Sequence, residues 1–98
     1  MMDLEQILKN FLDDRKRLKA FPAKRKMKVY ALFYLAGKFE QGKRYTEPEV
    51  NDLLDRWHTF HDPATLRREL YNGHFLNREP NGSLYWLEEK QPSMEVFL

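Results

Sequence analysis

The sequence predicts a small α+β domain that is mostly helical and ends in a β-hairpin. Apolar residues recur with helical spacing from Leu4 to Asn72, and two of these stretches begin with recognisable capping residues. After Gly73 the pattern changes to two short strand-like runs separated by Pro80-Asn81-Gly82, and Asn-Gly is a strong hairpin signal. We therefore expect one domain over residues 1–88 and a tail over 89–98.

Composition limits the possible functions. The chain has 98 residues, a hydrophobic content of 42%, a formal net charge of +2 and no cysteine, so a disulfide framework and a thiolate metal site are both ruled out. We expect a cytoplasmic protein without membrane contact, because there is no signal-peptide pattern and no apolar run of membrane length. The positive charge is concentrated between Arg15 and Lys28, a stretch without acids, which indicates an anionic partner.

The first element is an amphipathic helix within residues 1–20, followed by a basic linker. Its apolar side chains follow helical spacing and form one stripe, made of Leu4, Ile7, Leu8, Phe11 and Leu12. The stripe either packs on the core of the domain or pairs with a second copy of the chain, and the sequence leaves both possibilities open.

The second helix is expected over residues 23–39, because Pro22 disfavours helical geometry at Phe21. It is apolar nearly all round after its basic first turn, so it should be the buried central helix. A short strand at Arg44-Tyr45 comes next. The third helix, over residues 47–57, begins with a capping box in which the side chains of Thr46 and Glu49 each bond the backbone N–H of the other residue.

The fourth helix has a marker at each end. Asp62 is a good N-cap, Pro63 suits the first helical position, and Gly73 is expected to end the helix in the left-handed conformation. At about 100° per residue, one side is apolar and the opposite side groups Thr65, Arg68, Glu69 and Asn72.

Arg67 lies inside the apolar arc of this helix. A guanidinium there is costly to bury unless it is paired. We therefore expect Arg67 to be structural, bonded to Glu47, to Glu49 or to the backbone of the hairpin.

The hairpin strands are expected at residues 75–79 and 83–87. Tyr85 and Trp86 alternate across the second strand, so only one of them can face the core. We assign Trp86 and Trp57 to the core. The order of elements from residue 21 to residue 88 is that of a winged helix-turn-helix, with the hairpin as the wing and the first helix as an addition.

Four segments of the chain resemble, in the same order, the bacterial family called domain of unknown function 2087. They are Phe21-Pro22-Ala23-Lys24-Arg25-Lys26, Lys43-Arg44-Tyr45-Thr46-Glu47-Pro48-Glu49-Val50-Asn51, Thr65-Leu66-Arg67-Arg68-Glu69-Leu70 and Gly82-Ser83-Leu84-Tyr85-Trp86. The resemblance covers residues 18–87. It implies a cytoplasmic bacterial protein linked to transcriptional regulation, and it implies no catalytic residues.

DNA binding is the sharper of two functional hypotheses. Cations in the first turn of the second helix are suited to hold phosphates. On the fourth helix, arginine and asparagine can pair with guanine and adenine edges, and polar residues of the wing can touch the backbone or the minor groove. The candidate nucleic-acid-binding residues are Lys24, Arg25, Lys26, Lys28, Thr65, Arg68, Asn72, Arg78 and Asn81.

The alternative is a protein-interaction or dimerisation module that does not contact nucleic acid. Glu69 favours it, because a carboxylate on the outer face of the fourth helix would meet phosphates with the wrong sign. A homodimer through the first helix is one form of this alternative.

Catalysis and bound cofactors are not expected. The sequence has no nucleophile motif and no glycine-rich loop before a helix. His58, His61 and His74 with Asp62 have loose spacing for a zinc site, so we expect no metal.

Overall fold

The computed structural model describes residues 3–94, so the end of the predicted tail, residues 95–98, lies outside the described residues. The elements are α1 (Leu4–Ile7), a 3₁₀ turn (Lys9–Phe11), α2 (Arg25–Ala36), β1 (Tyr45–Thr46), α3 (Glu47–Asp55), α4 (Pro63–Asn72), β2 (Leu76–Arg78) and β3 (Leu84–Leu87). The predicted α+β class and the C-terminal hairpin are confirmed. The helices α2 and α3 are shorter than the predicted 23–39 and 47–57, whereas α4 has the predicted ends.

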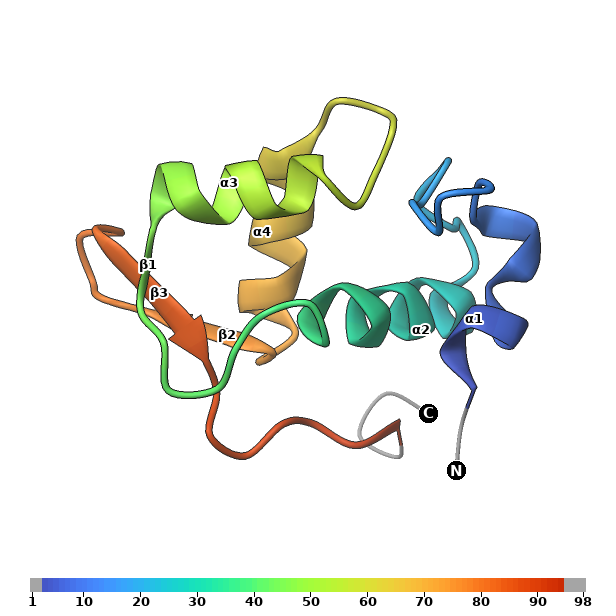
Figure 1. Cartoon of the computed structure of the whole chain (residues 1–98). Coiled ribbons are helices and arrows are strands. Elements are labelled where there is room, and N and C mark those ends of the chain that lie inside the picture. The colour runs from blue at the N-terminus through green and yellow to red at the C-terminus, as the bar shows by residue number, and fades with distance from the viewer. Residues whose placement is uncertain (1–2, 95–98) are drawn as a thin grey trace.

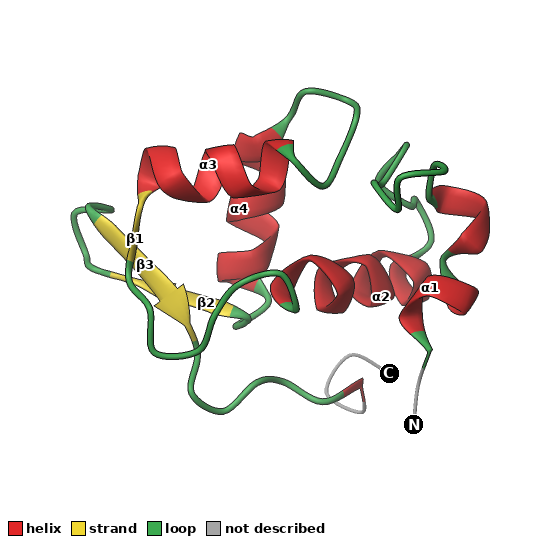
Figure 2. Cartoon of the chain, in the orientation of Figure 1, coloured by secondary structure: helices red, strands yellow, loops and turns green. Residues whose placement is uncertain are grey.

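The three strands form one antiparallel sheet in the order β1-β3-β2. Tyr85 of β3 stands opposite Tyr45 of β1 and opposite Arg78 of β2. The sheet lies at one end of the molecule and α1 at the other, with α2 between them (Figures 1 and 2). No helix among residues 3–94 has the length and apolar character to cross a membrane.

One hydrophobic core joins all these elements. The fully buried side chains at its centre come from the N-terminal segment, from the helices and from the residue before β2, and include Leu8, Leu18, Leu35, Leu54, Leu66, Leu70 and Phe75. The edge of the Phe33 ring meets the Phe75 ring at 4.8 Å between centroids, which ties α2 to the start of β2.

The first helix is shorter than predicted. It ends at Ile7, and Leu12 is already extended and pairs with Leu18. The chain turns back because the Asp13 carboxylate accepts hydrogen bonds from the backbone N–H groups of Arg15 and Arg17. The hydrogen bond from the Arg17 backbone is also the main reason that the pKa of Asp13 lies below its usual value.

The stripe nevertheless packs on the domain itself. Leu8 and Leu12 are buried in the common core, and Leu4 and Phe11 pack partly buried against it. Leu18 also pairs with His58 of the α3–α4 connection. Of the two possibilities left open by the sequence, the structure therefore shows the first.

The helix caps follow the sequence closely, with one exception. Both bonds of the Thr46–Glu49 capping box are present, and the bond from the Thr46 backbone N–H lowers the pKa of Glu49. Asp62 accepts the backbone N–H of Thr65; hydrogen bonds from the Thr65 side chain and then its backbone lower the pKa of Asp62.

The exception is Gly73, for which the predicted left-handed conformation is wrong. Its φ is −84°, and His74 takes the positive φ of 66° instead. Space favours glycine here, because a Cβ at Gly73 would lie only 3.0 Å from the Phe75 ring and 3.1 Å from the Glu69 carbonyl oxygen.

The assignment of Trp86 to the core is also wrong. Tyr85 is the side chain that faces inward, with 3% exposure, because the strand pairing places it opposite the buried Tyr45. Trp86 is half-buried on the outer face of the sheet, where the Arg44 guanidinium lies 4.2 Å from the ring centroid. Trp57, by contrast, is half-buried but packs against the core, and the ammonium of Lys38 lies 3.9 Å from its ring centroid.

Candidate nucleic-acid interface

The first turn of α2 presents a group of cations at the positive end of a helix. Lys24, the N-cap residue, gives no side-chain hydrogen bond to the helix, and the turn contains no acid. Lys24, Arg25 and Lys26 are exposed, whereas Lys28 is half-buried, with its ammonium 5.3 Å from the centroid of the Phe21 ring. The first N–H groups of a helix have no partner within it, so this end of α2 has an electrostatic preference for anions.

The outward face of α4 is a ridge of three exposed residues. Leu66 and Leu70 are fully buried, and Ala64, Arg68 and Asn72 follow one another at intervals of four on the opposite side. This ridge carries Arg68 at its centre and no exposed acid, so two of the predicted base-contacting residues, Arg68 and Asn72, lie in a row. The third, Thr65, is half-buried beside the N-cap.

A groove of about 390 Å³ separates the start of α2 from the end of α4. Its lining contains both charged and apolar side chains, and consists of Ala23, Arg25, Lys28, Val29, Leu32, Glu69, Asn72 and Gly73. The structure therefore brings two of the predicted phosphate contacts, Arg25 and Lys28, to the same groove as Asn72.

Glu69 occupies a different place from the one the sequence suggested. It is half-buried and lines the groove across from Arg25 and Lys28, rather than standing on the outward ridge. Its position on the helical wheel, about 100° from Arg68, is compatible with this placement. The sequence alone did not show that α2 lies on that flank.

The two candidate residues of the hairpin lie apart from the groove. The Arg78 guanidinium is 4.5 Å from the Tyr71 ring centroid, and hydrogen bonding to Tyr71, and then to Tyr85, raises the pKa of Arg78. Asn81 accepts the backbone N–H of Ser83 within the turn. Arg78 is thus packed between the hairpin and the flank of α4, while Asn81 is exposed at the hairpin tip.

Arg67 forms a polar link between α4 and the start of α3. Its guanidinium is 2.7 Å from a carboxylate oxygen of Glu47 and also donates to the Asn51 side chain. The Arg67 side chain is 17% exposed and that of Glu47 45% exposed, so the pair is only partly shielded from water.

Replacing Arg67 with alanine should therefore lower the free energy of unfolding by about 2 kcal/mol, less than the loss at a fully buried pair. Denaturant unfolding measures this change. Arg68→Ala, at the neighbouring exposed position, is the control and should change stability by less than about 0.5 kcal/mol. Equal stability of the two variants would contradict a structural role for Arg67.

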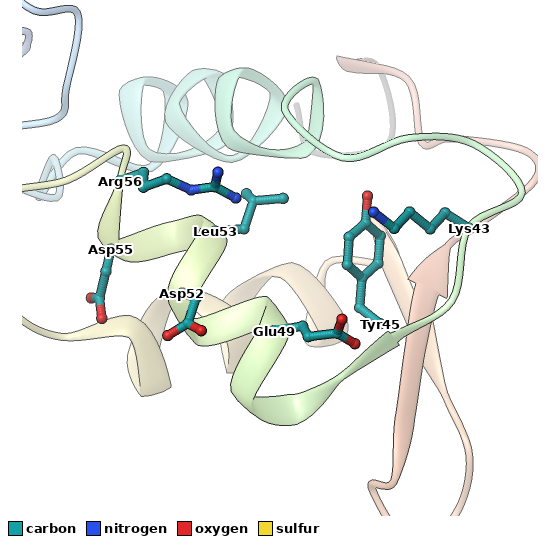
Figure 3. Close-up of a pocket in the computed structure, with 7 residues that line it drawn as sticks. All are labelled: Lys43, Tyr45, Glu49, Asp52, Leu53, Asp55 and Arg56. Atoms are coloured by element: carbon teal, nitrogen blue, oxygen red, sulfur yellow. The ribbon is translucent and has the colours of Figure 1, made fainter.

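The exposed side of α3 has the opposite charge. Three of its carboxylates, from Glu49, Asp52 and Asp55, border a cavity of about 490 Å³ that Lys43, Tyr45, Leu53 and Arg56 complete (Figure 3). Charges are therefore segregated, with acids along α3 and cations at the start of α2. A polyanion would be attracted to the start of α2 rather than to the cavity beside α3, where Lys43 and Arg56 offset only two of the three carboxylates.

The histidines do not assemble a metal site. His58 is buried; its Nδ1 lies 2.6 Å from the Leu54 carbonyl oxygen, and its Nε2 accepts the backbone N–H of Asp62 at 2.9 Å. Nδ1 must carry the hydrogen, because a carbonyl can only accept. Both ring nitrogens are thus engaged by the backbone, and no group of three His, Asp or Glu side chains within residues 3–94 is placed to hold an ion.

Comparison with curated proteins and with solved structures gives no significant match. Residues 17–87, which include the groove, α4 and the hairpin, match the family described as an uncharacterized protein conserved in bacteria (DUF2087). This match confirms the resemblance drawn from the sequence. The chain belongs to the bacterial domain of unknown function 2087 family.

Proposed function

We propose that this protein is a non-catalytic winged helix-turn-helix module that binds duplex DNA and takes part in transcriptional regulation. The observation that supports it best is the groove in which Arg25 and Lys28 of α2 meet Asn72 of α4. Affinity for DNA comes mostly from phosphate contacts and specificity from base edges, so an interface needs both kinds of residue side by side.

The arrangement of elements suits this function. From α2 onward the order is three helices with a short strand after the first and a hairpin at the end, and the sheet order is β1-β3-β2. This order is compatible with a winged helix-turn-helix, in which α3 and α4 would form the helix pair. The second helix of such a pair enters the major groove, and here it would present Arg68 and Asn72.

Charge supports the same orientation. The cations of the α2 first turn would hold phosphates beside the major groove that α4 enters, while the acidic surface of α3 would face away from the duplex. Arg68 and Asn72 would then reach guanine and adenine edges, their common partners.

One observation favours the alternative of a protein-interaction or dimerisation module. Trp86 is half-buried on the outer face of the sheet and borders a cavity of about 550 Å³ together with Arg44 and Glu88. Tryptophan and arginine are enriched at protein interfaces relative to the rest of the surface. This surface lies on the sheet, so it can coexist with a DNA-binding α4.

The test is binding of the purified protein to a mixed-sequence duplex at two salt concentrations. We expect affinity to fall steeply with salt, and the Lys24→Ala, Arg68→Ala double variant to bind about tenfold more weakly with a shallower salt dependence. The matched control is Lys43→Ala, Lys90→Ala, which removes the same charge from exposed positions elsewhere. No binding at low salt, or an equal loss in the control, would refute the proposal and favour a protein partner.

A further inference from the structure

Glu69 is the one acid among the residues that line the groove between α2 and α4. It lies across from Arg25 and Lys28, is half-buried, and has no hydrogen-bond or ion-pair partner for its carboxylate among the described residues. Because the Glu69 carboxylate is not bonded to either cation, it can interact directly with a ligand that enters the groove.

The fold does not depend on the Glu69 side chain. Its backbone carbonyl accepts the N–H of Gly73 at 2.9 Å and so ends α4, but glutamine at this position would provide the same carbonyl. The neighbouring apolar contacts of α4 come from Leu66 and Leu70. An isosteric change from carboxylate to amide should therefore leave the structure intact.

The carboxylate has a selective effect on a bound duplex. Phosphates held by Arg25 and Lys28 would lie near Glu69 and be repelled by it, whatever the base sequence. An amino group on a base edge would offset this repulsion by donating to the carboxylate. In the major groove, the cytosine N4 amino group is the usual partner of glutamate.

We infer that Glu69 is a specificity-determining residue of this interface, which weakens binding to duplexes in general and favours those that present a cytosine amino group to the end of α4. This inference rests on the proposed DNA-binding function. Glu69 would weaken binding to duplexes that lack this amino group. Proteins use such repulsive contacts to discriminate between partners that share the same attractive contacts.

The test compares the wild-type protein with Glu69→Gln and with Glu89→Gln, a matched control that removes the same charge at an exposed position outside the groove. Each protein is titrated with a mixed-sequence duplex and with a duplex enriched from a randomised pool by the wild type. We expect Glu69→Gln to bind the mixed-sequence duplex about fivefold more tightly, and to lose about fivefold in its preference for the enriched duplex. Glu89→Gln should change each value by less than about twofold.

The outcomes distinguish a failure of the Glu69 inference from a failure of the proposed DNA-binding function. A wild-type protein that binds no DNA at low salt overturns both. A wild-type protein that binds while Glu69→Gln and Glu89→Gln behave alike overturns the role of Glu69 alone. The role of Glu69 is also overturned if the duplexes enriched by the wild type share no cytosine. It is overturned as well if they match the duplexes enriched by Glu69→Gln. Equal melting temperatures of the three proteins confirm that the comparison concerns binding.

Discussion

Replacing Leu8 with alanine is expected to lower the free energy of unfolding by about 3 kcal/mol, within the range for a buried leucine. Leu8 is fully buried in the common core, although it lies before residue 17, where the family match begins. The substitution would leave a cavity between the N-terminal segment and the domain, and the surrounding side chains could fill it only in part. Denaturant unfolding followed by tryptophan fluorescence measures the change.

Lys9→Ala is the control for Leu8→Ala, because Lys9 is the exposed neighbour in the same segment. It should change the free energy of unfolding by less than about 0.5 kcal/mol. A Leu8 variant as stable as this control would mean that the N-terminal segment is not part of the cooperative unit. A single transition in the Leu8 variant at lower denaturant would show that the segment and the family domain unfold together.

The second large effect is expected at His58. A change to phenylalanine keeps an aromatic ring of similar size but leaves the Asp62 backbone N–H without its partner. It also removes one of two hydrogen bonds to the Leu54 carbonyl, which still accepts the backbone N–H of Trp57. An unsatisfied buried polar group costs about 1–3 kcal/mol and a lost hydrogen bond about 1 kcal/mol, so we expect a loss of about 3 kcal/mol in the free energy of unfolding. The effect should be strongest at the start of α4, since the Asp62 N–H belongs to the cap of that helix.

His61→Asn provides the comparison for His58→Phe. His61 is exposed and has a φ of 56°, a conformation that asparagine tolerates. It should therefore unfold like the wild type. Amide hydrogen exchange measures the local stability of α4. We expect faster exchange in the first turn of α4 in the His58 variant only. If both variants melted alike, the two hydrogen bonds of His58 would not be stabilising.

Features set by local chemistry could be predicted from the sequence. The capping box at Thr46 and the N-cap at Asp62 depend on side chains within three residues, and the hairpin depends on Asn81-Gly82. The sequence predicts Glu47, Glu49 or the hairpin backbone as the partner of Arg67, and in the structure the Arg67 guanidinium pairs with Glu47. These predictions succeed because the interacting groups are near in sequence or are forced together by a costly charge.

Features that depend on which elements become neighbours could not be predicted. Because side chains alternate along a strand, the sequence predicts that either Tyr85 or Trp86 faces the core. The pairing of β3 with β1 determines that it is Tyr85. The apolar stripe of the N-terminal segment fits a longer helix, yet the turn held by Asp13 redirects the chain after Leu12. The place of Glu69 depends on the flank of α4 that α2 covers, and no pattern within α4 contains that information.

Thr46 is at once the last residue of β1 and the N-cap of α3, so no connecting loop lies between the sheet and that helix. This connection contains no hinge residue, because rotating the sheet relative to α3 would break the capping hydrogen bonds at the N-terminus of the helix. The link from Arg67 to Glu47, the residue after Thr46, fastens α4 to the same point. Sheet, α3 and α4 should consequently meet any partner as a rigid body with preset geometry, so that little conformational entropy is lost on binding and the partner has to provide any adjustment in shape.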